Sequence, residues 1–176
     1  MFGAGNVIGP YVIIEDGVRI GARNRIMAGA YIARGTTLGD DNVIHMHAVI
    51  GHAPQDLAYQ GQETFTRIGN KNEIREFVTI HRGTKEGSAT EIGDENFIMA
   101  YCHIAHNCHI HDHIVIANAV NLAGHVEVED HAIIGGMTPV HQFVRVGSYA
   151  FVGGGSRLPQ DVPPFVKVAG NPIEVA

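Results

Sequence analysis

The feature that most constrains this chain is an aliphatic residue that recurs every six positions. Stepping by six from Ile8 to Leu158, the sequence has Ile, Leu or Val at all but three of twenty-six positions. The exceptions are Asp56, Gln62 and Glu86. A period of six is neither the 3.6 of an α-helix nor an unbroken strand alternation. It predicts short strands joined by turns, with one large inward-pointing residue in each unit.

Two other slots of the six-residue unit are also selective. The residue after the aliphatic one is often glycine, as at Gly21 and Gly39, and we expect it to relieve the steric cost of the corner. The residue four positions after the aliphatic one is mostly small or branched, which suits a narrow interior. Cys102 and Cys108 occupy this slot in consecutive units. We therefore expect buried, packed thiols rather than a disulfide framework.

The repeat also predicts the fold. Stacked repeats bury a continuous core, and hexapeptide periods indicate a parallel β-helix. Three units would make one three-sided coil of 18 residues, so we expect an all-β solenoid over residues 1–162. Two stretches near 51–67 and 83–91 break the aliphatic slot but keep its phase, and we expect external loops there. Residues 163–176 are rich in proline and predict an extension or linker.

Composition and charge exclude several classes of protein. The net charge of -6 argues against a nucleic-acid binder, which would normally show a basic stripe. No apolar run approaches the ~20 residues that span a bilayer, so we expect no stable membrane insertion. The first residues lack a charged and then apolar export signal. The expected location is the cytoplasm.

Coil arithmetic gathers a candidate site. Residues 18 apart in such a coil stack at about 4.8 Å, the spacing of neighbouring strands. His106, Gly124 and Gln142 then form one column, and His125 and His141 fall in the two columns beside it. Imidazole supplies a base near neutral pH, and a glycine in the stack leaves a backbone N–H accessible to an oxyanion. We therefore predict that three imidazoles converge on one corner.

Most of the other histidines are expected to be solvated corner residues. The six in this group are His45, His47, His109, His111, His113 and His131.

Several strings resemble one family of hexapeptide-repeat acyltransferases over nearly the whole chain. They are QDLAY, TIHRGT, HIAHNC, NLAGHV, IIGGMTPVHQF and QDVPPF. The chain resembles the UDP-N-acetylglucosamine O-acyltransferases that open lipid A biosynthesis. This resemblance implies a left-handed coil and a homotrimer with active sites between subunits. It also implies transfer of an (R)-3-hydroxyacyl group from acyl carrier protein to the 3-position of the sugar nucleotide. No metal or cofactor is implied beyond the phosphopantetheine that carries the acyl donor.

The resemblance assigns roles by motif. His106 becomes the general base, the Gly124 N–H the oxyanion donor, and His125 a further member of the catalytic group. The implied substrate-binding residues are Gln55, Asp56, His81, His103, His141 and Gln142. The implied acyl-chain pocket consists of Asn118, Gly136 and Gly154, and a glycine at the last position leaves room for a longer chain.

The chain departs from the family pattern in three places. Family members often carry Asp immediately after the catalytic histidine, where a carboxylate favours the charged imidazole, and this chain has Asn107. They also commonly have Lys where this chain has Ala58. The family normally continues past GNP into a helical region with basic residues, whereas this sequence stops at Ala176. We expect the fold to survive this difference and substrate binding to weaken.

Two alternative functions remain open at this stage. Hexapeptide solenoids also host zinc hydratases of the γ-carbonic-anhydrase type, and His106 and His111 have a compatible spacing. A trimeric scaffold that has lost turnover is the other alternative. The acceptor could also be a 3-amino analogue, which would give an amide. Candidates for a basic surface that receives the carrier protein are Arg67, Lys71, Arg75, Arg82, Lys85, Arg145 and Arg157.

Overall fold

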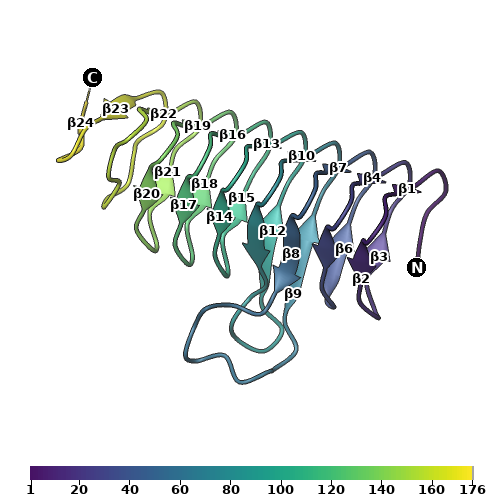
Figure 1. Cartoon of the computed structure of the whole chain (residues 1–176). Helices are drawn as coiled ribbons and strands as arrows, with labels where there is room; N and C mark the ends of the chain where they lie inside the picture. Colours follow the sequence, from purple (N-terminus) through teal and green to yellow (C-terminus); the bar gives the residue numbers. More distant parts are fainter. Residues whose placement is uncertain (176) are drawn as a thin grey trace.

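The computed structural model describes residues 1–175 and confirms the predicted fold. The chain winds as a left-handed parallel β-helix, a three-sided prism with the two termini at opposite ends (Figure 1). Ala176, the last residue of the predicted extension, lies outside the described residues. Among residues 1–175, no helix is long and apolar enough to cross a membrane.

Three sheets form the faces of the prism, and each takes every third strand in the coiled region. The first sheet contains β1 (Val7–Ile8), β4 (Arg25–Ile26), β7 (Val43–Ile44), β10 (Glu73–Ile74), β13 (Phe97–Ile98), β16 (Val115–Ile116), β19 (Ile133–Ile134), β22 (Phe151–Val152), β23 (Lys167–Ala169) and β24 (Glu174–Val175). The second contains β2 (Ile13–Ile14), β5 (Tyr31–Ile32), β8 (Val49–His52), β11 (Thr79–His81), β14 (His103–Ile104), β17 (Asn121–Leu122) and β20 (Pro139–Val140). The third contains β3 (Arg19–Ile20), β6 (Thr36–Leu38), β9 (Phe65–Ile68), β12 (Ala89–Ile92), β15 (His109–Ile110), β18 (Glu127–Val128) and β21 (Arg145–Val146).

The register of the paired strands explains why the aliphatic residues return to the inner face after each of the two external loops. Residues 18 apart pair in an uninterrupted coil, as Phe97 and Val115 do. In the two coils with external loops, Val43 pairs with Glu73 and Glu73 pairs with Phe97, at separations of 30 and 24 residues. The insertions therefore amount to two repeat units and one repeat unit. Because each is a whole number of units, the aliphatic residues resume on the inner face.

Parallel strand pairing continues past residue 162, into the expected C-terminal extension. β23 pairs in parallel with β22, with Phe151 opposite Lys167. β24 then turns back and pairs antiparallel with β23. The ladder of parallel strands thus extends to Ala169.

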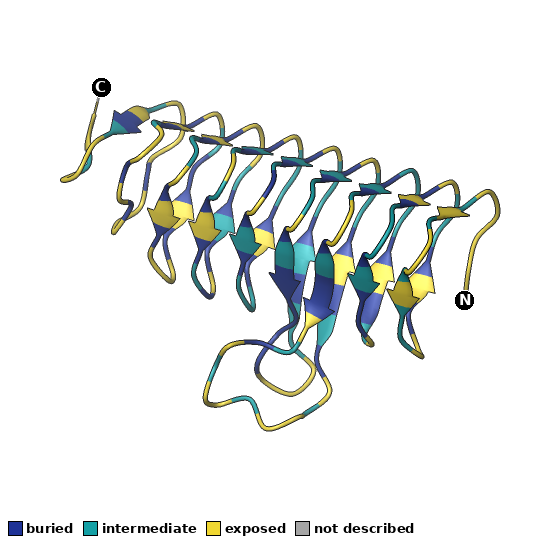
Figure 2. Cartoon of the chain, viewed as in Figure 1, coloured by how far each residue is buried: buried dark blue, intermediate teal, exposed yellow. Residues whose placement is uncertain are grey.

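The interior is the aliphatic ladder itself. Every ladder residue from Ile20 to Leu158 is at most 3% exposed, and Figure 2 shows the inward positions as buried along the length of the prism. Ile8 is 45% exposed, because β1 pairs only with β4. Cys102 and Cys108 are buried free thiols, as predicted, and burial raises their pKa values to about 11 and about 12.

The glycine slot relieves a steric conflict, as expected, and the conflict is with the neighbouring coil. Gly21 does not adopt a positive φ; the left-handed residue of this corner is Arg23, two positions later, with φ of 58°. A Cβ on Gly21 would lie 2.6 Å from the carbonyl oxygen of Gly39 in the next coil. Glycine is therefore needed there because two coils approach closely. The left-handed position of the turn is a different one, and it holds glycine in some units, such as Gly17 and Gly29, and other residues in most.

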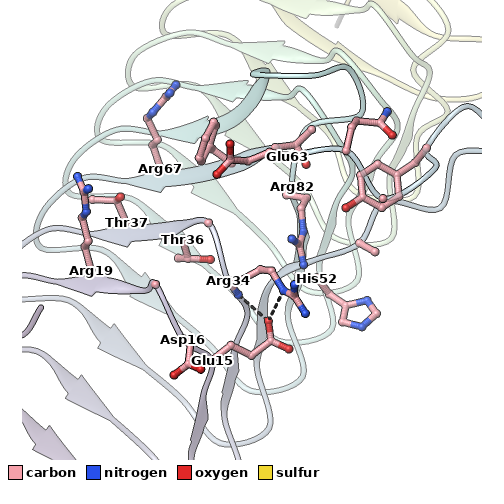
Figure 3. Close-up of a pocket in the computed structure, with 18 residues that line it drawn as sticks. Glu15, Asp16, Arg19, Arg34, Thr36, Thr37, His52, Glu63, Arg67 and Arg82 are labelled. Carbon is pink, nitrogen blue, oxygen red and sulfur yellow. Dashed lines mark hydrogen bonds and ion pairs between the residues drawn. The ribbon is translucent and has the colours of Figure 1, made fainter.

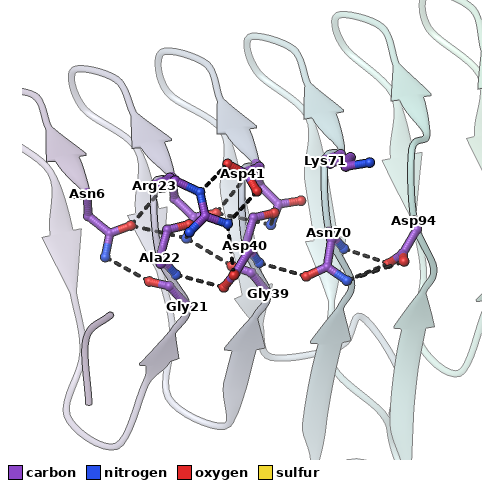
Figure 4. A network of polar contacts seen from close by, with 12 residues as sticks. Asn6, Gly21, Ala22, Arg23, Gly39, Asp40, Asp41, Asn70, Lys71 and Asp94 are labelled. Carbon is purple, nitrogen blue, oxygen red and sulfur yellow. Dashed lines mark hydrogen bonds and ion pairs between the residues drawn. The ribbon is translucent and has the colours of Figure 1, made fainter. Parts of the chain in front are cut away.

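Amide and carboxylate side chains run along one corner as ladders. In the outer ladder, Asn70 Oδ1 accepts the backbone N–H of Asp40 at 2.8 Å, and Asp94 Oδ1 accepts that of Asn70 at 2.6 Å (Figure 4). In the buried inner ladder, Asn42 Oδ1 accepts the N–H of Asn72 at 2.9 Å. These side chains satisfy backbone groups that the strands leave unpaired at the turn.

The two external loops project from one corner of the prism (Figure 1). The first connects β8 to β9, and the second connects β11 to β12. They contact each other: the Gly87 N–H donates to the Glu63 carbonyl at 2.8 Å, and the Gln62 side chain donates to the Thr84 carbonyl. The loops therefore support each other beside the same corner.

The inner ladder gives the first testable prediction. Asn72 Oδ1 accepts the Asn96 N–H at 3.0 Å, and its Nδ2 donates to the Gly93 carbonyl at 2.8 Å. Asn72→Ala leaves both groups buried without partners, so we expect the free energy of unfolding to fall by about 1–3 kcal/mol. Urea unfolding measures this change.

The matched control is Asn121→Ala, because Asn121 is exposed on β17. We expect it to change the unfolding free energy by less than about 0.5 kcal/mol. Equal effects of the two substitutions would contradict a structural role for the buried ladder.

Candidate active site

His106 lies in the turn between β14 and β15, at the corner from which both loops project in neighbouring coils. The next residue, Asn107, is left-handed with φ of 60°, a conformation that asparagine tolerates better than most residues. The Asn107 N–H donates to Thr90 Oγ1 at 2.8 Å. The turn is thus fixed by local hydrogen bonding, and the imidazole projects from a rigid position.

Gly124 lies directly against the imidazole of His106, as the 18-residue column predicts. A Cβ on Gly124 would lie 2.5 Å from His106 Cε1 and 2.6 Å from Nε2, so a side chain there would displace the ring. Gly124 is buried. Among residues 1–175, the Gly124 N–H donates to no backbone carbonyl. The imidazole of His106, a possible base, therefore lies next to the buried N–H of Gly124, a possible hydrogen-bond donor.

Both loops contribute groups that orient His106. Asn107 Oδ1 lies 3.1 Å from His106 Nδ1 and also accepts the Thr84 N–H of the second loop at 3.0 Å. Asp56 Oδ2, from the first loop, lies 3.6 Å from His106 Nε2. The Ala58 N–H donates to Asp56 at 2.9 Å and holds the pKa of this carboxyl below its usual value. A carboxylate therefore faces His106 from the loop, although Asn107 carries no charge.

A cavity of about 370 Å³ opens beside this corner. Five of the predicted site residues line it, namely Gln55, His81, His103, His106 and Gly124. The remaining lining residues are Ala105, Asn121, Leu122, Ala123, Pro139 and Val140. Asn121 was missed in the sequence, although it stands 18 residues after His103 and pairs with it across β14 and β17.

His81 and His103 are held as neutral imidazoles. His81 is buried, and desolvation together with nearby His103 lowers its pKa to about 4. The two rings meet edge to face with centroids 4.8 Å apart. Burial also lowers the pKa of His103, and its Nδ1 lies 2.7 Å from Thr79 Oγ1. Both rings can therefore make directional hydrogen bonds to a ligand without adding charge near pH 7.

The predicted convergence of three imidazoles is seen for two of them. The rings of His106 and His125 lie perpendicular with centroids 5.3 Å apart. Burial, followed by the charges of His106 and Lys85, lowers the pKa of His125. His141 and Gln142 are exposed and do not line the cavity, and His141 Nδ1 contacts the Gln142 carbonyl oxygen at 3.1 Å. Lys85, on the second loop, brings a cation near the site, which Ala58 cannot do.

The predicted acyl-chain residues form a column on a different corner. A Cβ on Gly154 would lie 3.2 Å from the Gly136 carbonyl oxygen, and one on Gly136 would lie 3.0 Å from that of Asn118. The three residues therefore stack in consecutive coils. Any side chain larger than hydrogen at Gly136 or Gly154 would crowd the neighbouring coil.

A second, larger cavity of about 990 Å³ lies under the first loop (Figure 3). Four arginines line it, Arg19, Arg34, Arg67 and Arg82, and Glu15 accepts the Arg34 N–H at 2.7 Å. Two of these arginines belong to the predicted basic surface.

Three other members of the predicted basic surface pair with acids: Lys71 with Glu95, Arg75 with Glu76, and Arg145 with Glu129. These ion pairs reduce the positive charge that this surface would offer to an acidic partner.

The structure gives no support to a zinc site built on His106 and His111. Within residues 1–175, the one group of three or more metal-ligating side chains that converge contains His109, His111 and Glu127. His106 is not part of it.

Comparisons with known proteins agree with the hexapeptide repeat and point to one family of acyltransferases. The Bacterial transferase hexapeptide (six repeats) family matches residues 2–34, 17–52 and 89–124. An acyl-[acyl-carrier-protein]–UDP-N-acetylglucosamine O-acyltransferase of Thermodesulfovibrio yellowstonii is 53% identical over 165 residues, which cover 93% of this chain and 64% of that protein. The protein of the same name from Synechocystis sp. is 50% identical over 140 residues, 80% of this chain and 51% of that protein. The chain thus spans about half to two thirds of the length of these curated relatives.

A solved structure extends the match to nearly the whole chain. LpxA from Acinetobacter baumannii superposes with a TM-score of 0.96 at 41% identity, covering 99% of this chain and 69% of that one. Both the fold and the sequence of the described solenoid are therefore shared. This chain belongs to the UDP-N-acetylglucosamine acyltransferase family of hexapeptide-repeat proteins.

Proposed function

We propose that this chain is an acyl-[acyl-carrier-protein]–UDP-N-acetylglucosamine O-acyltransferase that catalyses the first step of lipid A biosynthesis. The observation that carries the proposal is the imidazole of His106 set against the buried N–H of Gly124, beside a cavity of about 370 Å³. The names of the relatives, which are longer than this chain, support the same reaction.

In the proposed mechanism His106 acts as a general base. Its Nε2 takes the proton of the sugar 3-hydroxyl while that oxygen attacks the thioester carbonyl carbon of the (R)-3-hydroxyacyl donor. The resulting oxyanion accepts the Gly124 N–H, a type of interaction worth about 10²–10³-fold in rate. Collapse of the tetrahedral intermediate breaks the carbon–sulfur bond, and the leaving phosphopantetheine thiolate takes up the proton that the imidazolium holds. The charge of Asp56, 3.6 Å from Nε2, favours the intermediate imidazolium.

The other site residues have proposed binding roles. Gln55, His81 and His103 line the cavity and would hold the sugar nucleotide by neutral hydrogen bonds. His141 and Gln142 are exposed and would join the site across a subunit boundary.

The acyl-chain residues remain a proposal as well. Asn118, Gly136 and Gly154 would line the path of the acyl chain, and glycine at position 154 would leave room for a longer one. No cofactor is proposed beyond the phosphopantetheine of the donor.

A homotrimer in the cytoplasm is part of the proposal. Aromatic and apolar side chains stand exposed along one corner, with Phe77 45%, Tyr101 62% and Met137 73% exposed. Assembly would remove such surface from water. Light scattering should give three times the mass of the chain, and a monomer would contradict sites shared between subunits.

The acyl-transfer assay tests the function. Purified chain, an (R)-3-hydroxyacyl carrier protein and UDP-N-acetylglucosamine should give the 3-O-acylated product, and the 3-amino analogue tests the alternative acceptor. His106→Ala should lower kcat by about 10²–10⁴-fold, because the base is lost.

His131→Ala is the control, since His131 is exposed and stacks on His113 at a different corner. It should leave kcat unchanged. A folded trimer that forms no product with either acceptor, even at millimolar concentration, would favour the scaffold alternative.

The buried imidazole of His81 predicts a pH dependence of stability. Its pKa in the folded chain is about 4, below the unfolded value near 6.5, so the unfolded state binds more protons between these values. Stability from this group is therefore present above pH 6.5 and is lost as the pH falls toward 4. Urea unfolding at neutral pH and near pH 5 should show the loss, and His81→Gln should make it smaller. An unchanged pH dependence in His81→Gln would contradict a buried neutral imidazole.

A further inference from the structure

The third sheet carries a group of ligand atoms that the proposed acyl transfer does not use. His109 lies on β15, His111 follows that strand, and Glu127 lies on β18 in the next coil. His109 and Glu127 are register partners. His109 and His111 flank the inward Ile110, so their side chains both point outward. Strand pairing therefore brings the three side chains to one patch of the outer face.

The ligand atoms of this patch converge at distances that suit one ion. One nitrogen from each imidazole and one carboxylate oxygen all lie within 4.8 Å of one another. His111 Nε2 lies 3.2 Å from Glu127 Oε1. Two ligands that are each about 2.0–2.1 Å from a tetrahedral ion lie roughly 3.3 Å apart. The distance between His111 Nε2 and Glu127 Oε1 is therefore already close to the distance between two ligands of a tetrahedral ion.

A fourth ligand is within reach from the preceding coil. Glu91, on β12, pairs with His109, and its Oε2 lies 3.9 Å from His109 Nε2. Its other oxygen accepts Arg67 Nη1 at 2.7 Å, which fixes the carboxylate. Arg145 Nε lies 3.8 Å from Glu127 Oε2, the oxygen that does not face His111. Both arginines therefore engage oxygens turned away from the imidazoles.

The donor set selects the class of ion. Two imidazole nitrogens and a carboxylate oxygen suit Zn²⁺ and its transition-metal neighbours, whereas Mg²⁺ and Ca²⁺ prefer oxygen ligands. The side chains of His109, His111 and Glu127 are 52%, 33% and 36% exposed, so an ion can enter without rearrangement of the coil.

We propose that His109, His111 and Glu127 bind one Zn²⁺ ion per chain, with Glu91 or water as the fourth ligand. The ion cross-links the coils of β15 and β18 on the outer face, and through Glu91 also that of β12. The site shares no residue with the cavity at His106. Zinc therefore stabilises the solenoid and takes no part in acyl transfer.

The chain offers a matched control cluster. His113 and His131 also stack, with centroids 4.7 Å apart, and His113 Nδ1 lies 3.4 Å from Glu95 Oε2. Their ligand atoms are not part of the converging group. This cluster has the same composition as the proposed site without its geometry.

Zinc titration of chelator-treated protein without a histidine tag tests the proposal, with a chromophoric chelator as competitor. Wild type should bind one Zn²⁺ per chain with a Kd of about 10 µM or below. His111→Ala and Glu127→Gln should each raise the Kd at least about tenfold. His113→Ala and His106→Ala should leave it unchanged. Circular dichroism confirms that every variant is folded.

Two further readouts separate a built site from loose surface binding. Co²⁺ in place of Zn²⁺ should give the visible absorption of a four-coordinate ion in wild type, and His111→Ala should lack it. Zinc should raise the Tm of wild type by a few degrees and leave that of His111→Ala unchanged. The proposal is overturned if wild type binds no zinc at ~1 mM, if binding survives His111→Ala, or if binding is lost in His106→Ala or His113→Ala.

Discussion

The stacking of one coil on the next is the constraint on which the rest of the structure depends. Each strand is only two to four residues long, so no strand could persist without the backbone hydrogen bonds that it makes to the coils on either side. The same bonds hold the corners. The His125 N–H donates to the His106 carbonyl at 3.0 Å, and the Phe143 N–H donates to that of Gly124 at 3.1 Å. The positions of His106, Gly124 and His125 are therefore as fixed as the stacked coils, whereas Gln55 and Asp56 reach the site from the first loop.

The sequence predicted what depends on the six-residue period. It predicted the parallel β-helix, the buried aliphatic residues, the packed thiols of Cys102 and Cys108, and the placement of Gly124 against His106. It predicted that glycine relieves crowding at the corner, but the period alone does not separate a close backbone approach from a left-handed turn. Only the observed contact between Gly21 and Gly39 distinguishes the two.

Contacts made by side chains and loops could not be predicted from the period. His141 falls in the correct column, yet column arithmetic does not say where a side chain points, and it lies outside the cavity. The neutral state of His81 depends on its burial and on the neighbouring imidazoles of His103 and His52, which the six-residue period does not specify. Asp56 interrupts the aliphatic ladder, and for the same reason it is free to bring a carboxylate to the other nitrogen of His106. Asn107 thus orients the imidazole of His106, while Asp56 of the first loop supplies the negative charge.

The central claim is that His106 and Gly124 act as one unit. The kinetic double-mutant cycle of His106→Ala, Gly124→Ala and the combined variant tests it most directly, because the methyl group at position 124 would occupy the space of the imidazole. Residues that act as a unit are strongly non-additive in kcat. We predict that each single variant loses at least about 10²-fold in kcat and that the double variant is no slower than His106→Ala. Losses that multiply in the double variant would show that the two residues contribute independently, and would contradict the account.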